Sequence, residues 1–348
     1  MGRHITCIDG RQSPCTLAQV QSGLVPGRDP GRRPLERKVN RGPMNNRFGL
    51  TTLTVALILS GCGDGDVETP LVPSAEYTAF QSPELVEIQG YSGEVMEPFI
   101  TRDGRFLFFN NMGDDKDIFF AIRDGITGNF TYVDAIAAVN TPAVEGVPTL
   151  DDNNRFYYIS TFNYPPANAR ILDTIYVGDF DSSSPAVVNN LAVVANLDEG
   201  ILGHLNFDVE VSPEGATLYF VDGVFSGNPY PDVSNFVYAV DSGNGFVRQG
   251  DSPDIFSNIN TGDLEYAACI SRDGLEFFFT RLVLSTLETT IHRSTRPEIS
   301  APFGIPQKVS SISGFVEAPA LSADEKSLYY HRRNPDSGKF ELFRVTRP

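Results

Sequence analysis

The chain has 348 residues, 41% of them hydrophobic and 11% aromatic with no tryptophan, which is enough to form a large core. The formal charge of -17 is uneven, because residues 1–61 hold nine basic and three acidic residues and leave 18 basic and 41 acidic residues in 62–348, a net charge of about −23. This charge excludes nucleic acid as a partner and disfavours anionic lipid headgroups, while it tolerates cations and basic partners.

The first segment of the chain, residues 1–43, is rich in Arg, Gly and Pro and has no hydrophobic periodicity. Such a composition predicts disorder. Because the segment that follows is typical of a protein N-terminus, we expect translation to start at Met44 and residues 1–43 to be an extension outside the functional protein.

Residues 44–61 read as a signal peptide: Arg47 is followed by an apolar stretch from Leu50 to Leu59 that is too short to span a bilayer. The stretch ends in Leu-Ser-Gly-Cys, which resembles the bacterial lipoprotein box. That resemblance implies cleavage before Cys62, acylation of its thiol, and a soluble domain held at a membrane surface. The alternative is a chance apolar stretch with a buried cysteine.

The polar segment that starts "CGDGD", residues 62–75, is predicted to be a linker between the anchor and the folded domain. Gly63 directly after the cysteine resembles the sorting signal for the outer membrane of Gram-negative bacteria. We therefore expect the protein in the cell envelope, at the outer membrane, facing the periplasm or the exterior.

Four cysteines occur, but Cys7 and Cys15 precede the signal peptide, so only Cys62 and Cys269 belong to the mature chain. Two cysteines make neither a disulfide framework nor a metal cluster. Cys269 lies in a strand pattern and is predicted to be a small buried hydrophobe.

One pattern occurs five times in residues 76–348. The copies are "EPFITRDGRFLFFNN" from Glu97, "VPTLDDNNRFYYIST" from Val147, "DVEVSPEGATLYFVD" from Asp208, "AACISRDGLEFFFTR" from Ala267 and "APALSADEKSLYYHR" from Ala318. The shared turn position falls on Gly104, Asn154, Gly215, Gly274 and Glu325, at steps of 50, 61, 59 and 51 residues. Such a period indicates stacked copies of one supersecondary unit.

Each unit contains a short strand, a tight turn and an aromatic strand. Asp or Asn before the turn position starts the turn, and Gly or Asn at it allows a positive φ; Glu325 departs from this, so we expect a looser fifth turn. A third strand follows in every unit, for example "DIFFAI", and a fourth in four units, for example "FTYVDAI". Four antiparallel strands per unit predict an all-β fold, a β-propeller.

The fifth unit ends after its third strand, and the missing strand is found at the other end of the repeat region. Residues 80–90, "FQSPELVEIQG", resemble "FGIPQKVSSISG" at 303–314. We therefore predict a five-bladed propeller in which this N-terminal strand completes the last blade and closes the ring. Six blades are the alternative, since the two long steps leave room for a degenerate blade.

The repeat core, best kept in "SPEGATLYF" and "SRDGLEFFF", resembles the TolB-type, WD-like propeller repeat. The resemblance covers nearly all of the mature chain and implies the architecture, while propellers host many unrelated activities. TolB proteins act in the periplasm through protein contacts, including contacts with a lipoprotein. Nothing here resembles their N-terminal α/β domain, so an equivalent role does not follow.

Motifs for catalysis are lacking. There is no G-x-S-x-G, H-E-x-x-H, cysteine pair or P-loop, and we expect His292 and His331 to be structural. No cofactor is expected. Calcium stays open, because carboxylates cluster without the spacing of an EF-hand loop: these are Asp64 and Asp66, Asp114, Asp115 and Asp117, and Asp179 and Asp181.

In a propeller, the loops before the innermost strands and the loops after the second strands share one face. The carboxylates and aromatic residues expected there, at the mouth of the central channel, are Glu94, Glu97, Glu145, Asp208, Glu265, Glu317, Tyr164 and Tyr230. They suit a cation, a basic peptide or a stacked sugar. Alternatively, acidic residues fall there because the whole chain is acidic.

Three hypotheses follow. The first is a membrane-tethered binding or scaffold lipoprotein, expected to be monomeric, with a protein or glycan ligand in the envelope. The second is a carbohydrate-active enzyme of the glycosidase kind, which needs two carboxyls about 5–10 Å apart. The third is a purely structural envelope protein.

Overall fold

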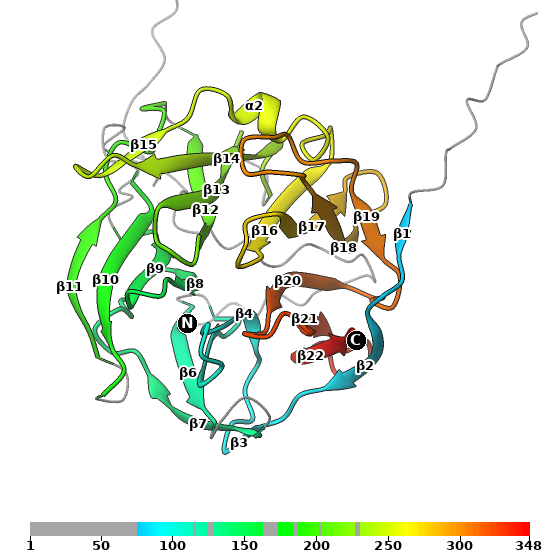
Figure 1. Ribbon diagram of the computed structural model, residues 1–348. Helices are drawn as coiled ribbons and strands as arrows, with labels where there is room; N and C mark the ends of the chain where they lie inside the picture. Colours follow the sequence, from blue (N-terminus) through cyan, green and yellow to red (C-terminus); the bar gives the residue numbers. More distant parts are fainter. Residues whose placement is uncertain are drawn as a thin grey trace, which may run out of the picture. The chain divides into compact units, whose positions relative to one another are not determined.

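The computed structural model describes residues 75–348 apart from 114–115, 124–127, 163–172, 184–186, 202 and 227–229. These residues form five sheets around a common axis, so the predicted five-bladed propeller is confirmed and the six-bladed alternative is wrong (Figure 1). The predicted extension 1–43, signal peptide 44–61 and Cys62 lie outside the described residues.

Each blade has four antiparallel strands, the first of which lies nearest the axis (Figure 1). Blade 1 contains β4 (Met96–Ile100), β5 (Phe106–Asn110), β6 (Ile118–Ile122) and β7 (Phe130–Ala135), and blade 2 contains β8 (Glu145–Leu150), β9 (Arg155–Ser160), β10 (Ile175–Asp181) and β11 (Val187–Val193). Blade 3 contains β12 (His204–Val211), β13 (Thr217–Val224), β14 (Val233–Asp241) and β15 (Phe246–Arg248). Blade 4 contains β16 (Leu264–Ile270), β17 (Glu276–Val283), β18 (Glu288–Thr295) and β19 (Gln307–Val309), and blade 5 contains β20 (Val316–Leu321), β21 (Ser327–Arg333), β22 (Phe340–Thr346) and β2 (Gln81–Leu85).

A single helical turn, α2 (Ser252–Ile255), lies beside β14. Within the described residues, no helix has the length and apolar character that a membrane crossing requires.

The ring closes as predicted, because the N-terminal β2 pairs antiparallel with β22 at the C-terminus, with Leu85 opposite Phe343. The segment also reaches further than predicted. Two short strands flank β2 and join the neighbouring blades in parallel: β1 (Glu76–Tyr77) pairs with β19 of blade 4, and β3 (Ile88–Gln89) pairs with β7 of blade 1. The segment from 76 to 89 therefore crosses three blades in succession, which ties the two ends of the ring together.

The likeness between residues 80–90 and 303–314 has a structural counterpart. The Arg347 guanidinium lies over the Phe80 ring at 5.0 Å, and the Arg296 guanidinium lies over the Phe303 ring at 4.4 Å. The two phenylalanines therefore occupy the same place in blades 5 and 4.

The turn position has a positive φ in all five blades: 73° at Gly104, 62° at Asn154, 79° at Gly215, 71° at Gly274 and 56° at Glu325. The expectation of a looser fifth turn is wrong. Glu325 N–H donates to the Ser322 carbonyl at 2.9 Å, as the Gly274 N–H does to Ser271 at 3.0 Å. The Asp324 carboxylate accepts from the Ser322 hydroxyl and the Lys326 N–H, and these local bonds hold Glu325 in a conformation that usually favours glycine.

The core lies between the blades, where the second-strand residues pack against the neighbouring sheet. Leu107, Leu218, Phe277 and Leu328 are fully buried, and Phe108 meets Phe156 of the next blade edge to face at 5.1 Å. Burial of each such side chain stabilises the fold by about 1.5–3 kcal/mol, so closely packed interfaces between blades account for most of the stability.

Candidate functional site

Every innermost strand carries a β-bulge seven residues before its turn position. The bulge residues, none of them glycine, have φ values of 47° at Glu97, 52° at Val147, 52° at Asp208, 53° at Ala267 and 56° at Ala318. A positive φ costs a non-glycine residue roughly 1 kcal/mol or more. Five occurrences at one position indicate that the surrounding bonds over-determine this conformation.

Two of the predicted carboxylates bind the bulge of the next blade. Glu97 Oε2 accepts from the Val147 N–H at 3.3 Å, and Asp208 Oδ2 accepts from the Ala267 N–H at 3.0 Å. At a third interface the Ala318 N–H donates to the Thr280 hydroxyl at 3.0 Å. These side chains therefore tie adjacent blades together at the axis.

Glu317 belongs to the same axial group. The Tyr266 hydroxyl donates to Glu317, whose Oε2 lies 3.0 Å from His331 Nε2. His331 Nδ1 accepts from the Glu97 N–H at 3.0 Å, so the ring proton resides on Nε2 and points at Glu317. His331 thus acts as a structural link between blades 5 and 1.

Lys116 supplies the positive charge of the group. Its Nζ lies 3.2 Å from Glu97 Oε1, and both side chains are only 4% exposed. Burial, and then the Glu97 carboxylate, raise the pKa of Asp208 well above its usual range. Burial and Glu317 also raise the pKa of Tyr266. The axial group therefore combines a carboxylate paired with a lysine and a carboxylate whose pKa is raised by its surroundings.

Glu145 and Glu265 are also completely buried, but each is held within its own blade. Glu145 accepts from the Thr141 N–H at 2.9 Å and from the Thr141 hydroxyl at 2.8 Å. Glu265 repeats the arrangement with Thr261, at 3.0 Å and 2.7 Å. Burial raises the pKa of both carboxylates. The spacing in "TPAVE" and "TGDLE" is the sequence signal for these two loops.

The remaining predicted site residues lie away from this group. Glu94 is half-buried and accepts from the Phe340 N–H at 3.2 Å. Tyr230 is half-buried against the core of blades 3 and 4, and Tyr164 lies outside the described residues.

Sequence reasoning missed a second axial group on the side nearer the turns. Arg102 Nη2 and Glu210 Oε1 form a buried ion pair at 3.2 Å, and Glu210 Oε2 accepts from the Thr149 hydroxyl at 2.7 Å. Burial raises the pKa of Glu210 and of the nearby Cys269 thiol. Cys269 is buried, as predicted, and its Sγ accepts from the Leu321 N–H at 3.2 Å.

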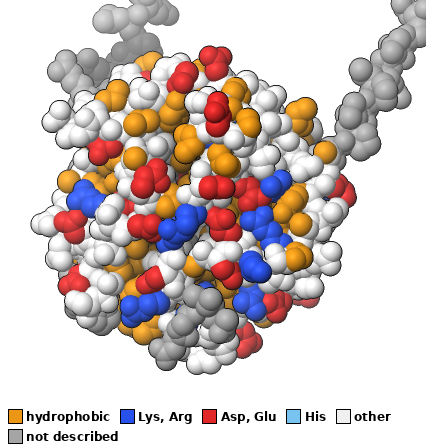
Figure 2. Space-filling view, viewed as in Figure 1, with side chains coloured by type: hydrophobic (Ala, Val, Ile, Leu, Met, Phe, Trp, Pro, Cys, Tyr) orange, Lys and Arg blue, Asp and Glu red, His pale blue; other side chains and the backbone are white. Residues whose placement is uncertain are grey.

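The cavity between the two axial groups has a volume of about 30 Å³ and is lined in part by Glu97, Arg102, Glu210, Ala267 and Ala318. That is about the share of one water molecule in the liquid. Side chains also fill the centre of the ring on the face shown in Figure 2. The axial carboxylates therefore converge without a substrate-sized space among the described residues.

His292 and Asp179, considered from the sequence for catalysis and for calcium binding, make contacts with neighbouring side chains. His292 is buried and stacked on Phe279 at 5.5 Å, and burial lowers its pKa to about 3. Asp179 is paired with Arg155 at 2.6 Å and with Asn190 at 2.7 Å. The described residues contain no group of three or more metal-ligating side chains, and Asp64, Asp66, Asp114 and Asp115 lie outside them.

Comparisons with known proteins support the fold. No protein-family model matches the sequence, and no curated protein is similar to it. Among solved structures, an endo-arabinase from Bacteroides thetaiotaomicron is 15% identical with a TM-score of 0.50, over 76% of this chain and 98% of that one. An alpha-L-arabinofuranosidase catalytic domain from Coprinopsis cinerea is 12% identical with a TM-score of 0.48, over 79% and 97%.

A putative TolB from Agrobacterium tumefaciens is 15% identical with a TM-score of 0.42, over 77% of this chain and 79% of that one. Of these structures, the endo-arabinase reaches a TM-score of 0.50 and shares the propeller fold. At these identities the likeness concerns the fold and leaves the activity open.

Proposed function

We propose that the propeller is a binding or scaffold module of the cell envelope, tethered to a membrane through an acyl group on Cys62. The burial of the axial carboxylates carries this proposal: Glu97, Asp208 and Glu317 are at most 5% exposed. Because these groups hold blades together around a cavity of about 30 Å³, they have no room for a sugar ring. The surface loops then remain as the place for a ligand.

Exposed apolar side chains on the loops of blades 2 and 3 support this reading. Phe162 after β9 is 61% exposed, Ile201 before β12 is 49% exposed, and Val233 at the start of β14 is 40% exposed. These positions lie at the ends of strands opposite the turns. We infer that these three side chains contribute to one exposed apolar patch, which is the kind of surface that binds a partner.

The test is a pull-down from envelope extracts beside a glycan array, followed by a binding isotherm with the partner that is identified. We expect the double substitution Phe162→Ser with Val233→Ser to weaken binding at least about tenfold, which corresponds to about 1.4 kcal/mol. Ile305→Ser is the control, because Ile305 is 78% exposed but lies before β19 on blade 4. Equal losses in both variants, or no saturable ligand, would contradict the proposal.

The tether has its own test. Mass spectrometry of the mature protein should find an acylated cysteine at the N-terminus, and Cys62→Ala should leave the precursor uncleaved. Cleavage at another site, or a free Cys62 thiol, would remove the anchor from the proposal.

A second candidate is a glycoside-cleaving enzyme: the unequal surroundings of the axial acids favour it, and the lack of room for a sugar ring beside them opposes it. Glu97 is paired with Lys116, whereas the pKa of Asp208 is raised by burial and by Glu97. Glycosidases need two carboxyls in different protonation states. Hydrolysis of arabinan or other glycans that Glu97→Gln abolishes would establish this candidate and would overturn the binding role.

A further inference from the structure

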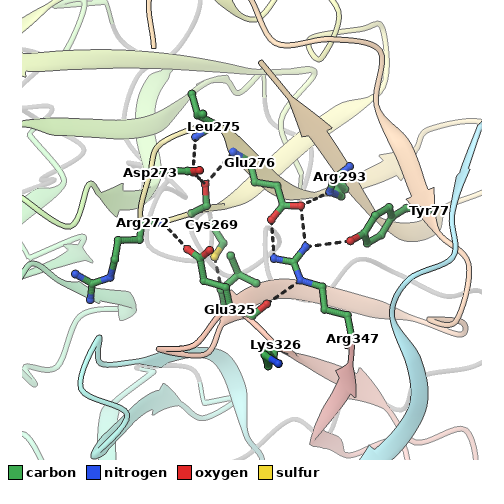
Figure 3. Close-up of polar contacts among 12 residues, drawn as sticks. Tyr77, Cys269, Arg272, Asp273, Leu275, Glu276, Arg293, Glu325, Lys326 and Arg347 are labelled. Carbon is green, nitrogen blue, oxygen red and sulfur yellow. Dashed lines mark hydrogen bonds and ion pairs between the residues drawn. The ribbon is translucent and has the colours of Figure 1, made fainter. Parts of the chain in front are cut away.

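The interface between blades 4 and 5 contains a carboxylate held by two arginines. Glu276, the first residue of β17, accepts from Arg347 through both oxygens, at 2.8 Å and 2.7 Å, and also from Arg293 Nε (Figure 3). Burial opposes the charge, but the hydrogen bonds from Arg347 and Arg293 lower the pKa of Glu276 below its usual range. This arrangement is a complete two-arginine clamp around one carboxylate.

The repeat places the same two arginines at the interface between blades 5 and 1. Arg123 corresponds to Arg347, because their Nε atoms donate to the carbonyls of the turn residues Gly104 and Glu325, at 2.7 Å and 2.8 Å. Arg344 corresponds to Arg293, because each lies opposite the residue four positions after a turn residue, Tyr329 or Phe278.

The carboxylate is the part that is missing from this second clamp. The position of Glu276 is taken in blade 5 by Ser327, since both lie two residues after the turn position. The N–H of each residue donates to a serine hydroxyl of its own turn, at 2.8 Å in blade 4 and 2.9 Å in blade 5. Arg123 is 6% exposed, and the described residues form no ion pair with it.

Space accompanies the missing carboxylate. A groove of about 390 Å³ and an adjoining cavity of about 160 Å³ share Arg123, Tyr329 and Arg344 in their linings, and Ser327 lines the smaller one. The groove is within the size range of sites for small molecules. Its wall also includes Glu87, Gln89 and Asn129, which offer hydrogen bonds to hydroxyl or amino groups.

The third copy of the arginine shows that such space is not a general consequence of the repeat. Arg296 donates to the Gly274 carbonyl at 2.8 Å and to the Tyr219 hydroxyl at 3.1 Å, between blades 4 and 3. There the fully buried Phe256, which follows α2, packs on Phe303 at 5.7 Å and fills the interface. Blades 5 and 1 have no comparable insertion among the described residues.

Besides Glu87, two carboxylates of the protein lie near the groove, and both of these are engaged. Glu84 pairs with Arg344 through Nε in an exposed ion pair, and Arg344 also hydrogen-bonds to the Tyr329 side chain. Asp324 accepts from the Ser322 hydroxyl at 2.6 Å and from the Lys326 N–H at 3.1 Å within its own turn.

We propose that the groove between blades 5 and 1 binds a small molecule through a carboxylate, held by Arg123 and Arg344 as Glu276 is held by Arg347 and Arg293. The planar guanidinium fork matches a carboxylate in two-point contact, and the polar wall receives the rest of the molecule. An acidic sugar and an acidic amino acid share this chemistry. This groove lies apart from the exposed loops of blades 2 and 3, and the proposal does not depend on the binding function proposed for those loops.

Isothermal titration of the full chain with D-glucuronate, L-glutamate, inorganic phosphate and neutral glucose tests the site. We expect at least one carboxylate probe to bind and glucose not to bind. Ser327→Glu should place the protein's own carboxylate in the clamp, raise the melting temperature and weaken the probe at least about tenfold. Ser337→Glu adds the same charge at an exposed position and should leave binding unchanged.

Arg344→Gln gives a second measurement that does not depend on the fold tolerating Ser327→Glu, because the Arg344 side chain is 34% exposed. It should also weaken the carboxylate probe at least about tenfold. The proposal is overturned if neither carboxylate binds, if glucose or phosphate binds as tightly, or if Arg344→Gln leaves the affinity unchanged. Which carboxylate binds more tightly distinguishes a sugar acid from an amino acid.

Discussion

Truncation of Arg347 tests how the ring is closed. The side chain makes two bonds to Glu276, one to the Glu325 carbonyl at 2.8 Å and one to the Tyr77 hydroxyl at 3.0 Å. Removing one partner of a buried ion pair costs about 3–5 kcal/mol. Here Arg293 still compensates Glu276, and the paired side chains are 16% and 12% exposed, so we expect Arg347→Ala to lower the free energy of unfolding by roughly 2–3 kcal/mol.

For a domain of this size, that loss corresponds to a melting temperature lower by roughly 3–5 °C. Chemical and thermal unfolding measure it directly. Arg344→Ala is the matched control, because Arg344 lies in β22, which ends just before Arg347, but pairs with Glu84 at exposures of 34% and 49%. We expect it to cost about 0.5 kcal/mol. Equal losses in the two variants would refute the argument that burial at the ring closure makes Arg347 contribute more to stability than Arg344.

Three further changes test the axis and the turns. The pKa of Asp208 is raised in the folded protein, so Asp208 loses its proton in the unfolded chain first, and the stability of the wild-type protein falls as the pH rises above about 4. In urea unfolding, the stability of Asp208→Asn relative to the wild type should therefore increase with pH. A difference that does not change with pH would contradict the burial of that charge. Gly215→Ala introduces a side chain at φ 79°, where a Cβ would lie 2.3 Å from Asp151 Oδ2, so thermal unfolding should show a loss of about 1–3 kcal/mol, and an unchanged melting temperature would contradict it. Thr261→Val removes the 2.7 Å bond to buried Glu265 and should cost about 1–2 kcal/mol in chemical unfolding, whereas no loss would show that Arg281 alone is enough.

Much of the fold was predictable because the same strand and turn pattern occurs five times in the sequence. A turn position with one local conformation, and strands that alternate around it, depend on interactions within about ten residues. Closure was predictable from the likeness of Phe80 and Phe303 at the two ends of the chain. The short strands at 76–77 and 88–89 were not, because two-residue parallel pairings leave no periodic pattern.

The position of the candidate site near the axis could be predicted from the sequence, but the burial of its carboxylates could not. Glu97 and Asp208 fall in one repeat column, which placed them near the axis, but charged residues are usually exposed. Their burial depends on the backbone N–H groups of Val147 and Ala267, each about 50–60 residues away in the chain. Such partners become visible only when the blades are assembled.

The three copies of the arginine separate what the repeat imposes from what each interface adds. The bond from the arginine to the turn carbonyl is constant, at 2.7–2.8 Å, so it belongs to the architecture. The neighbouring blade then supplies Glu276, or Tyr219 with Phe256, or only Tyr329 and open space. The fold places an arginine at each of these three interfaces, but its neighbours supply a carboxylate at only one of them. Where the carboxylate is lacking, a ligand replaces it at the lowest cost in stability. The axial acids lack this freedom, because each is bonded to another blade and its loss would loosen the ring.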